Sequence, residues 1–528
     1  MQSTSKPLLL LLFLSFLGLE SQNLQFVNSS HSFTRTTELG EDSVRIELMN
    51  SSADGIRVKR IHFQQVFGTQ AYSASSSSFT IGAQQTALLN LYFHPSQNIA
   101  YSLPIVFETD SFYGCLVYEA DGQGAFSNTY YNSTENLSST ALFNALKTRI
   151  TAPYVSLSYN GARDEMYSDI DNSGGQVTCV YTGRVATFNS RSGANSNSFN
   201  TEHTWPQSLF NSASPMKSDI HHLFPTDVTS NSQRGSLPFG MVTGSPSWQQ
   251  GGSKMGGGKF EPRDLQKGTV ARAMMYFVLR YQNYSNFFDG NQETTLLGWH
   301  DDFPPSAKDR ARNNDIEQLQ ANRNPFTDYP QFSERLGLLS QNGSLGADKS
   351  WELMPDTIIM KQGTTANAVM YNSGNQSLNV NNIQLADTNF QYTFNGSMSL
   401  AAGEYRTVSI ELKHNVLTQS ELSLQTNSNV QVAGSVYLKS VLQNGIGIAE
   451  YASKKPTLFP NPSKAGGQIQ WDGEQFEFEI FDVHGREIYA SEELHTHSVL
   501  LPSLKPGIYT VFIQSVSGKL SIEKWVLY

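Results

Sequence analysis

Two long stretches of this 528-residue chain alternate polar and apolar side chains, and a region with a different pattern separates them. Ser43–Leu48 shows the alternation in the first stretch and Val408–Leu412 in the second. A period of two places every other side chain on one face of a strand, and neither stretch carries a helical stripe. We therefore predict a β-sandwich over residues 22–124 and a second over residues 346–447.

The region between the two stretches has the texture of mixed helices and loops. Leu142–Ile150 has helical spacing, and Gly268–Tyr281 predicts a stronger helix with several apolar side chains on one side. Glycine-rich loops lie between them, and long loops often carry function. We expect one α+β domain over residues 125–345, with Asp121–Gly124 as the linker that precedes it.

The N-terminus has the form of a secretory signal. Lys6 precedes an apolar run from Leu8 to Leu19, which is shorter than the roughly 20 residues that a membrane-spanning helix needs. We predict a signal peptide over residues 1–21 and no later transmembrane segment. Cys115 and Cys179 are the two cysteines, so one disulfide and two free thiols are both open, and a cysteine zinc site is not expected.

Two neighbouring segments, Asn200–Ser208 and Ser218–Arg234, concentrate the chemistry-bearing side chains. Adjacent residues of a strand face opposite sides, so Glu202 and His203 can serve one site only where the strand ends or bends. A carboxylate and an amide suit a hard cation that keeps its waters, and a histidine beside them could act as general base. Together with an arginine, this set indicates phosphodiester hydrolysis; the bland alternative is a surface carboxylate beside a core histidine.

A histidine-rich zinc site is a rival interpretation of the second segment. His221 and His222 are adjacent rather than one helical turn apart, and Pro225 interrupts a continuing helix, which argues against it. The net charge of −10 argues against a protein that coats nucleic acid but not against a nuclease, which needs only a local basic site.

Several ordered motifs over about residues 125–335 resemble the endonuclease I family of secreted and periplasmic nucleases. The motifs that carry the resemblance are Tyr130-Tyr131, Val180–Gly183, Glu202–Ser208, Asp219–Asp227, Asn231, Arg234-Gly235, Pro238–Gly240, Phe260–Pro262, Lys267–Tyr276 and Gln320–Pro330.

The resemblance implies a ββα-metal core in which Glu202 and Asn231 bind one magnesium ion, with calcium or manganese as alternatives. It makes His203 the general base that deprotonates the attacking water, and it implies products with 5′-phosphate and 3′-hydroxyl ends. Asp219, His221 and His222 could orient the ligands or could equally be core residues.

Three arginines, Arg234, Arg272 and Arg323, lie inside the matching motifs. Each could clamp a phosphate, with Arg234 the first choice, or could form an internal salt bridge. This chain departs from better-studied relatives at Lys217, where they have an acidic residue, and it lacks their several disulfides.

The C-terminal segment, residues 448–528, resembles the C-terminal sorting domain of the type IX secretion system. The resemblance is carried by Phe459–Pro462, Ile480–Arg486 and Leu504–Tyr509, with strands expected over Phe476–Phe481, Gly507–Gln514 and Leu520–Leu527. It implies the type IX machinery as a partner and a location outside the cell or on its outer surface.

We therefore predict a multidomain secreted protein. An α+β nuclease core is flanked by all-β, immunoglobulin-like sandwiches and a small β sorting domain. We expect a monomeric, magnesium-dependent endonuclease acting on DNA, RNA or both. The alternatives are an enzyme that prefers RNA and a surface adhesion protein whose inactive nuclease domain only binds nucleic acid.

Overall fold

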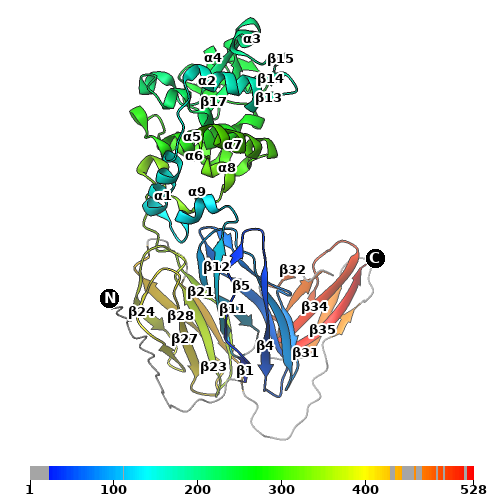
Figure 1. Ribbon diagram of the computed structural model, residues 1–528. Coiled ribbons are helices and arrows are strands. Elements are labelled where there is room, and N and C mark those ends of the chain that lie inside the picture. Colours follow the sequence, from blue (N-terminus) through cyan, green and yellow to red (C-terminus); the bar gives the residue numbers. More distant parts are fainter. Residues whose placement is uncertain are drawn as a thin grey trace, which may run out of the picture.

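The computed structural model describes residues 23–110, 112–428, 434–442, 457–459, 467–482, 486–491, 494–516 and 520–527. A helix-rich part stands at one end of three β modules whose strands lie side by side (Figure 1). The predicted signal peptide and the junction near residue 448 lie outside the described residues. The described chain is thus multidomain, with mixed helices and many β-sheets.

The first β module consists of two main sheets that enclose a common core. Alternation along β10 explains the packing, because Leu89, Leu91 and Phe93 are buried whereas Leu88 and Asn90 are exposed. One sheet has the order β1 (Leu24–Phe26), β4 (Asp42–Asn50), β10 (Thr86–Phe93) and β8 (Tyr72–Ala74). The other has the order β2 (Ser30–Ser32), β12 (Cys115–Ala125), β11 (Ala100–Thr109), β5 (Ile56–Phe63) and β9 (Phe79–Ile81), with β3 (Thr36–Thr37) on β12; β6 (Gln65–Val66) pairs β7 (Thr69–Gln70).

The second β module also has two sheets, and it shares a core with the first. Met354, Val369 and Tyr371 pack into the apolar core of the first module. One sheet has the order β21 (Glu352–Met354), β23 (Thr365–Tyr371), β27 (Tyr405–Leu412) and β25 (Phe390–Phe394). The other has the order β22 (Thr357–Met360), β29 (Ser435–Ser440), β28 (Gln419–Thr426), β24 (Leu378–Leu385) and β26 (Ser399–Leu400).

The C-terminal β module is one sheet that contacts the first module. The three strands expected there from the sequence are confirmed as parts of β31, β34 and β35. The strands are β30 (Thr457–Phe459), β31 (Gln468–Phe481), β34 (Gly507–Ser515) and β35 (Leu520–Leu527), with β32 (Glu487–Ala490) and β33 (His495–Leu500) on β31. Arg57 of β5 joins the modules, since it pairs with Glu479 at 3.0 Å and lies 4.0 Å from the ring centroid of Phe512.

The helix-rich part packs around α5 (Asp264–Arg280), most of whose side chains are buried. The predicted helices over 142–150 and 268–281 are confirmed as α1 (Ser139–Thr151) and α5. The other helices are α2 (Tyr159–Glu165), α3 (Arg191–Ser196), α4 (Val228–Arg234), α6 (Gly290–Asp302), α7 (Ala307–Gln320), α8 (Pro325–Asp328) and α9 (Phe332–Arg335). Three small antiparallel sheets complete it: β13 (Asn172–Ser173), β14 (Gln176–Thr178) and β15 (Val185–Thr187); β16 (Phe199–His203) and β17 (Leu223–Asp227); and β18 (Trp248–Gln250), β19 (Ser253–Gly256) and β20 (Lys259–Glu261).

The prediction that Asp121–Gly124 form a linker is wrong, because these residues belong to β12, in which residues 121–123 pair with β11 and Gly124 pairs with β3. The two glycines serve close packing instead. A Cβ on Gly122 would lie 2.6 Å from the Phe93 ring, and one on Gly124 would lie 2.1 Å from the Gln97 carbonyl oxygen. The chain therefore passes from the first module into the helix-rich part without a flexible spacer.

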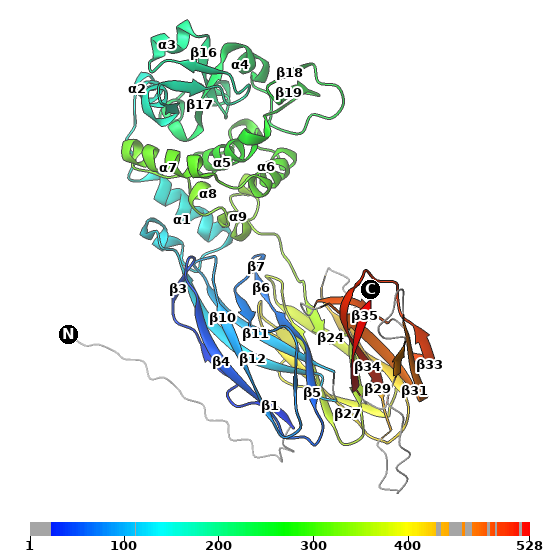
Figure 2. The same cartoon turned by 90° about the vertical axis from the view of Figure 1, so that its right-hand side faces the viewer.

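Polar contacts hold the base of the helix-rich part on the end of the first module. The Arg35 guanidinium forms two 2.7 Å bonds to Glu135, and Arg335 donates a 2.7 Å bond to Asn98. Figure 2 shows α1 and α9 at this end, and β16, β17 and α4 at the far end. The far end is thus the part of the helix-rich region most distant from the β modules.

Both cysteines are buried free thiols, which decides between the two alternatives that the sequence left open. Among the residues that the structure describes, no helix is both long enough and apolar enough to cross a membrane.

Candidate active site

A pair of strands and the helix that follows them bring Glu202, His203 and Asn231 to one place. Strand β16 ends at His203, and its partner β17 leads directly into α4, which carries Asn231. The helix starts there because the Asp227 side chain accepts a 2.8 Å bond from the Ser230 amide. The expectation that Glu202 and His203 stand where a strand ends is confirmed.

The Glu202 carboxylate is held on one side only. Its Oε1 accepts a 2.8 Å hydrogen bond from the Tyr181 hydroxyl and lies 3.1 Å from Arg234 Nε. Within the described residues no hydrogen bond or ion pair reaches Oε2. Burial raises the pKa of the Glu202 carboxyl, while Arg234 and Tyr181 act in the opposite direction. The arrangement presents one carboxylate oxygen to a ligand.

The His203 ring is oriented by a main-chain carbonyl. Its Nε2 lies 3.0 Å from the Lys217 oxygen, and because a carbonyl can only accept, Nε2 carries the proton. The lone pair is then on Nδ1, and no hydrogen bond to this nitrogen is found within the described residues. Burial, followed by the charge of neighbouring groups, holds the pKa of His203 well below its ordinary value. The ring is therefore neutral at neutral pH, with an unprotonated ring nitrogen at Nδ1.

The Asn231 side chain faces the strand that carries Glu202. Its Nδ2 donates a 3.5 Å bond to the main-chain oxygen of Thr201, the residue before Glu202. No hydrogen bond to Asn231 Oδ1 is found in the part of the chain that the structure describes, so the amide oxygen is free to bind a ligand.

The donor atoms fit a hydrated hard cation. Glu202 Oε2 and Asn231 Oδ1 are oxygens without other partners, and magnesium is commonly held by one or two such groups and several waters. Over the described ranges, no group of three or more His, Cys, Asp or Glu side chains could hold a metal ion. The rival zinc interpretation has no support, since His221 and His222 each turn Nε2 to a main-chain oxygen.

Arg234 is buried next to Glu202. Its side chain is 1% exposed, and besides Glu202 it donates to the main-chain oxygens of Thr204 and Gly235. Its contacts are those of a residue that orients Glu202. Phosphate binding by Arg234 stays a prediction.

Arg272 lies in a different part of the domain. It donates a 2.8 Å bond to the Phe303 oxygen and lies 3.4 Å from Asp309. Together with Arg263 and Arg312 it lines a cavity of about 480 Å³. Burial lowers the pKa of Arg272 to about 10. Its role in binding phosphate also stays a prediction.

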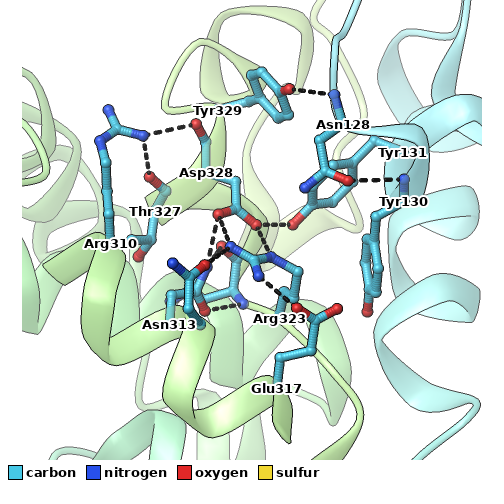
Figure 3. Close-up of polar contacts among 12 residues, drawn as sticks. Asn128, Tyr130, Tyr131, Arg310, Asn313, Glu317, Arg323, Thr327, Asp328 and Tyr329 are labelled. Atoms are coloured by element: carbon cyan, nitrogen blue, oxygen red, sulfur yellow. Dashed lines mark hydrogen bonds and ion pairs between the residues drawn. The ribbon is translucent and has the colours of Figure 1, made fainter.

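Arg323 is committed to a cluster around Asp328 (Figure 3). It bonds both Asp328 oxygens at 2.7 and 2.6 Å and reaches Glu317 at 2.6 Å. Tyr131 donates a further 2.6 Å bond to Asp328, which ties the cluster to the N-terminal part of the domain. These contacts are the internal salt bridge that the sequence left open as an alternative to phosphate binding.

The three residues expected to orient the ligands divide into two groups. Asp219 is fully buried and accepts bonds from Tyr276, Tyr281 and Gln320, besides its ion pair with Arg280. His221 packs on Tyr276 and bonds the Asn322 oxygen, so both residues support α5 and its neighbours. His222 alone touches the site, because its ring centroid lies 5.5 Å from that of His203.

Two contributors to the site have no role in the sequence-based prediction. Tyr181 bonds Glu202, although only its motif, Val180–Gly183, marked it in the sequence. Lys217 supplies the carbonyl that orients His203, and a main-chain role leaves no trace in residue type.

Comparison with known proteins matches two parts of the chain. The family model described as Endonuclease I matches residues 127–331, and that of the secretion system C-terminal sorting domain matches residues 457–528. An extracellular ribonuclease of Bacillus amyloliquefaciens is 34% identical over 232 residues, which cover 40% of this chain and 79% of that protein. The extracellular ribonuclease of Bacillus subtilis is 33% identical with the same coverage. An extracellular deoxyribonuclease of Aeromonas hydrophila is 31% identical over 116 residues, 21% of this chain and 49% of that protein.

Proposed function

The chain belongs to the endonuclease I family, and from that premise we propose a secreted, magnesium-dependent endonuclease whose general base is His203. One observation carries the proposal. A neutral imidazole with an available Nδ1 stands at the end of the strand that holds a carboxylate with an unpartnered oxygen. A base beside a cation site is what hydrolysis of a phosphodiester needs.

We propose that β16, β17 and α4 form a ββα-metal unit, with Glu202 and Asn231 as the ligands. Magnesium, when bound there, would stabilise the charge on the phosphate and on the leaving 3′ oxygen. Tyr181 and Arg234 hold Glu202 Oε1, so that Oε2 faces the cation. The same oxygen donors would accept calcium or manganese.

His203 removes a proton from the attacking water at Nδ1 in this proposal. The Lys217 carbonyl keeps the proton on Nε2, which fixes the tautomer and the ring plane. In-line attack of the water oxygen on phosphorus then breaks the bond to the 3′ oxygen, which takes a proton from solvent water, and the products are a 5′-phosphate and a free 3′-hydroxyl.

The substrate is DNA, RNA or both, and the protein acts outside the cell or on its surface. The matched relatives are named extracellular ribonucleases and an extracellular deoxyribonuclease. The sorting domain supports export through the type IX machinery. The match covers 79% of each ribonuclease and 49% of the deoxyribonuclease, so our second candidate function is an enzyme that prefers RNA. We propose that the enzyme is a monomer with immunoglobulin-like sandwiches.

The test uses the full chain with plasmid DNA and, separately, structured RNA, each with magnesium and with EDTA. We expect magnesium-dependent cleavage of at least one substrate, and a loss of ~10²-fold or more in His203→Ala. His300→Ala is the matched control, since His300 is also a buried histidine whose Nε2 bonds a main-chain oxygen, that of Pro330 at 3.0 Å. A folded chain that binds nucleic acid without cleaving it would overturn the proposal in favour of an adhesion or binding protein.

A further inference from the structure

Two positively charged side chains without an acidic partner lie near His203, the proposed general base. Lys217 Nζ lies 5.0 Å from the ring centroid of Tyr159, and the Arg163 guanidinium lies 5.4 Å from the same centroid. The Tyr159 ring in turn lies 5.6 Å from that of His203. One aromatic ring therefore holds two cations beside the general base.

The contacts of these cations leave their charges available. Arg163 donates one bond, from Nε to the Thr201 hydroxyl at 3.1 Å. Within the described residues neither Arg163 nor Lys217 forms an ion pair. Both residues are half-buried. Cations held without carboxylates are suited to an anionic ligand.

The three arginines singled out in the sequence differ in this respect. Arg234 pairs with Glu202, Arg272 lies beside Asp309, and Arg323 pairs with Asp328. Their guanidinium groups are buried in internal contacts. Lys217 and Arg163 are instead near the site, partly exposed and unpaired.

We propose that Lys217 and Arg163, held on the Tyr159 ring, bind a backbone phosphate of the substrate strand adjacent to the bond that is cut. This inference rests on the proposed function and names a subsite of the same active site. The ligand is a phosphodiester of either DNA or RNA, since the two side chains offer charge and N–H donors and no recognition of the sugar. Lys217 thus has two separable roles, because its carbonyl orients His203 while its ammonium binds the strand.

The separation makes Lys217→Ala informative, since the main-chain carbonyl stays in place. We expect KM to rise by about 5- to 20-fold with kcat changed less than about threefold, and the slope of log Kd against log salt to fall by ~1. Lys217→Arg should restore most of the loss. Arg191→Ala is the matched control, because this cation already pairs with Asp164 at 2.7 Å.

A second measurement separates this subsite from the catalytic proposal. His203→Ala provides a background without turnover, in which binding of a fluorescent oligonucleotide is measured with and without Lys217→Ala or Arg163→Gln. Replacing one backbone phosphate at a time by a neutral methylphosphonate should weaken binding at one position, and that penalty should disappear in the Lys217→Ala background.

The outcomes are distinct. Wild-type protein that fails to cleave refutes the proposed function, whatever the binding result. Wild-type protein that cleaves, with a Lys217→Ala variant of unchanged KM, unchanged salt slope and the full methylphosphonate penalty, refutes the subsite alone. A loss confined to kcat in folded Lys217→Ala also refutes it, since that would assign the side chain to the chemical step.

Discussion

The Tyr181 hydroxyl donates a 2.8 Å hydrogen bond to Glu202 Oε1, and both groups are buried in the helix-rich domain. The bond fixes the plane of the carboxylate whose other oxygen is available to a cation. The Tyr181 hydroxyl thus orients the carboxylate that we propose as a cation ligand.

Tyr181→Phe should weaken cation binding without removing a ligand. We expect the magnesium concentration for half-maximal activity to rise by about tenfold, as is typical when a partner of a metal ligand is lost. Titration of activity against magnesium measures the change. Tyr154→Phe is the control, because the Tyr154 hydroxyl is buried but has no hydrogen-bond partner among the described residues.

Asn231→Ala removes a proposed ligand and should have a larger effect. The half-maximal magnesium concentration should rise by at least about tenfold, because only one protein oxygen would remain for the cation. Calorimetric titration with magnesium in the absence of substrate checks the result directly. Ser232→Ala, the next position of α4, should leave the curve unchanged, and an equal effect there would contradict the assignment.

Arg323→Leu should destabilise the nuclease domain rather than weaken substrate binding. Removing the arginine leaves the buried Asp328 carboxylate without its cation, which costs about 3 to 5 kcal/mol in comparable buried pairs. Urea unfolding gives the stability and steady-state kinetics give KM. The exposed neighbour Arg310, whose bonds within the described residues go to main-chain oxygens at 3.1 and 3.0 Å, is the control (Figure 3). A raised KM at unchanged stability would instead support phosphate binding by Arg323.

Stability of the β modules should depend on pH through Asp110. Burial raises the pKa of this carboxyl to about 6, with nearby Arg57 acting against the shift. A raised folded-state pKa gives stability that is complete below the unfolded pKa, near 4, and is lost as the pH rises through about 6. Asp110→Asn should therefore stabilise the protein above pH 6, by about 1 to 2 kcal/mol after allowance for solvent screening, and should have little effect near pH 4.

Calorimetry at acidic and slightly alkaline pH tests that dependence. The exposed Asp54→Asn is the reference substitution. Equal effects of Asp110→Asn at both pH values would show that the carboxyl keeps its ordinary pKa in the folded chain.

Local patterns in the sequence predicted the β-sheets and the main helices, whereas contacts between distant residues could not be predicted from them. The alternation of β10 and the apolar side of α5 are properties of neighbouring residues, so both were foreseen. The place of Glu202 and His203 at a strand end followed from their adjacency. The partners of Arg323 are decided by packing, and the role of Lys217 by a main-chain atom. Gly122 and Gly124 look like a spacer in sequence. The ring and the carbonyl that leave no room for a Cβ at these positions come close only in the folded chain.

The common core of the first two β modules anchors the nuclease domain at both of its ends. The domain lies between these modules in the chain, and Met354, Val369 and Tyr371 lock the second module into the first. Both ends of the domain are consequently anchored in one body. A single backbone cut in the hairpin loop at Gly257-Gly258 would therefore leave two fragments that are still held together by the shared core. A nicked enzyme would remain one particle until it was unfolded.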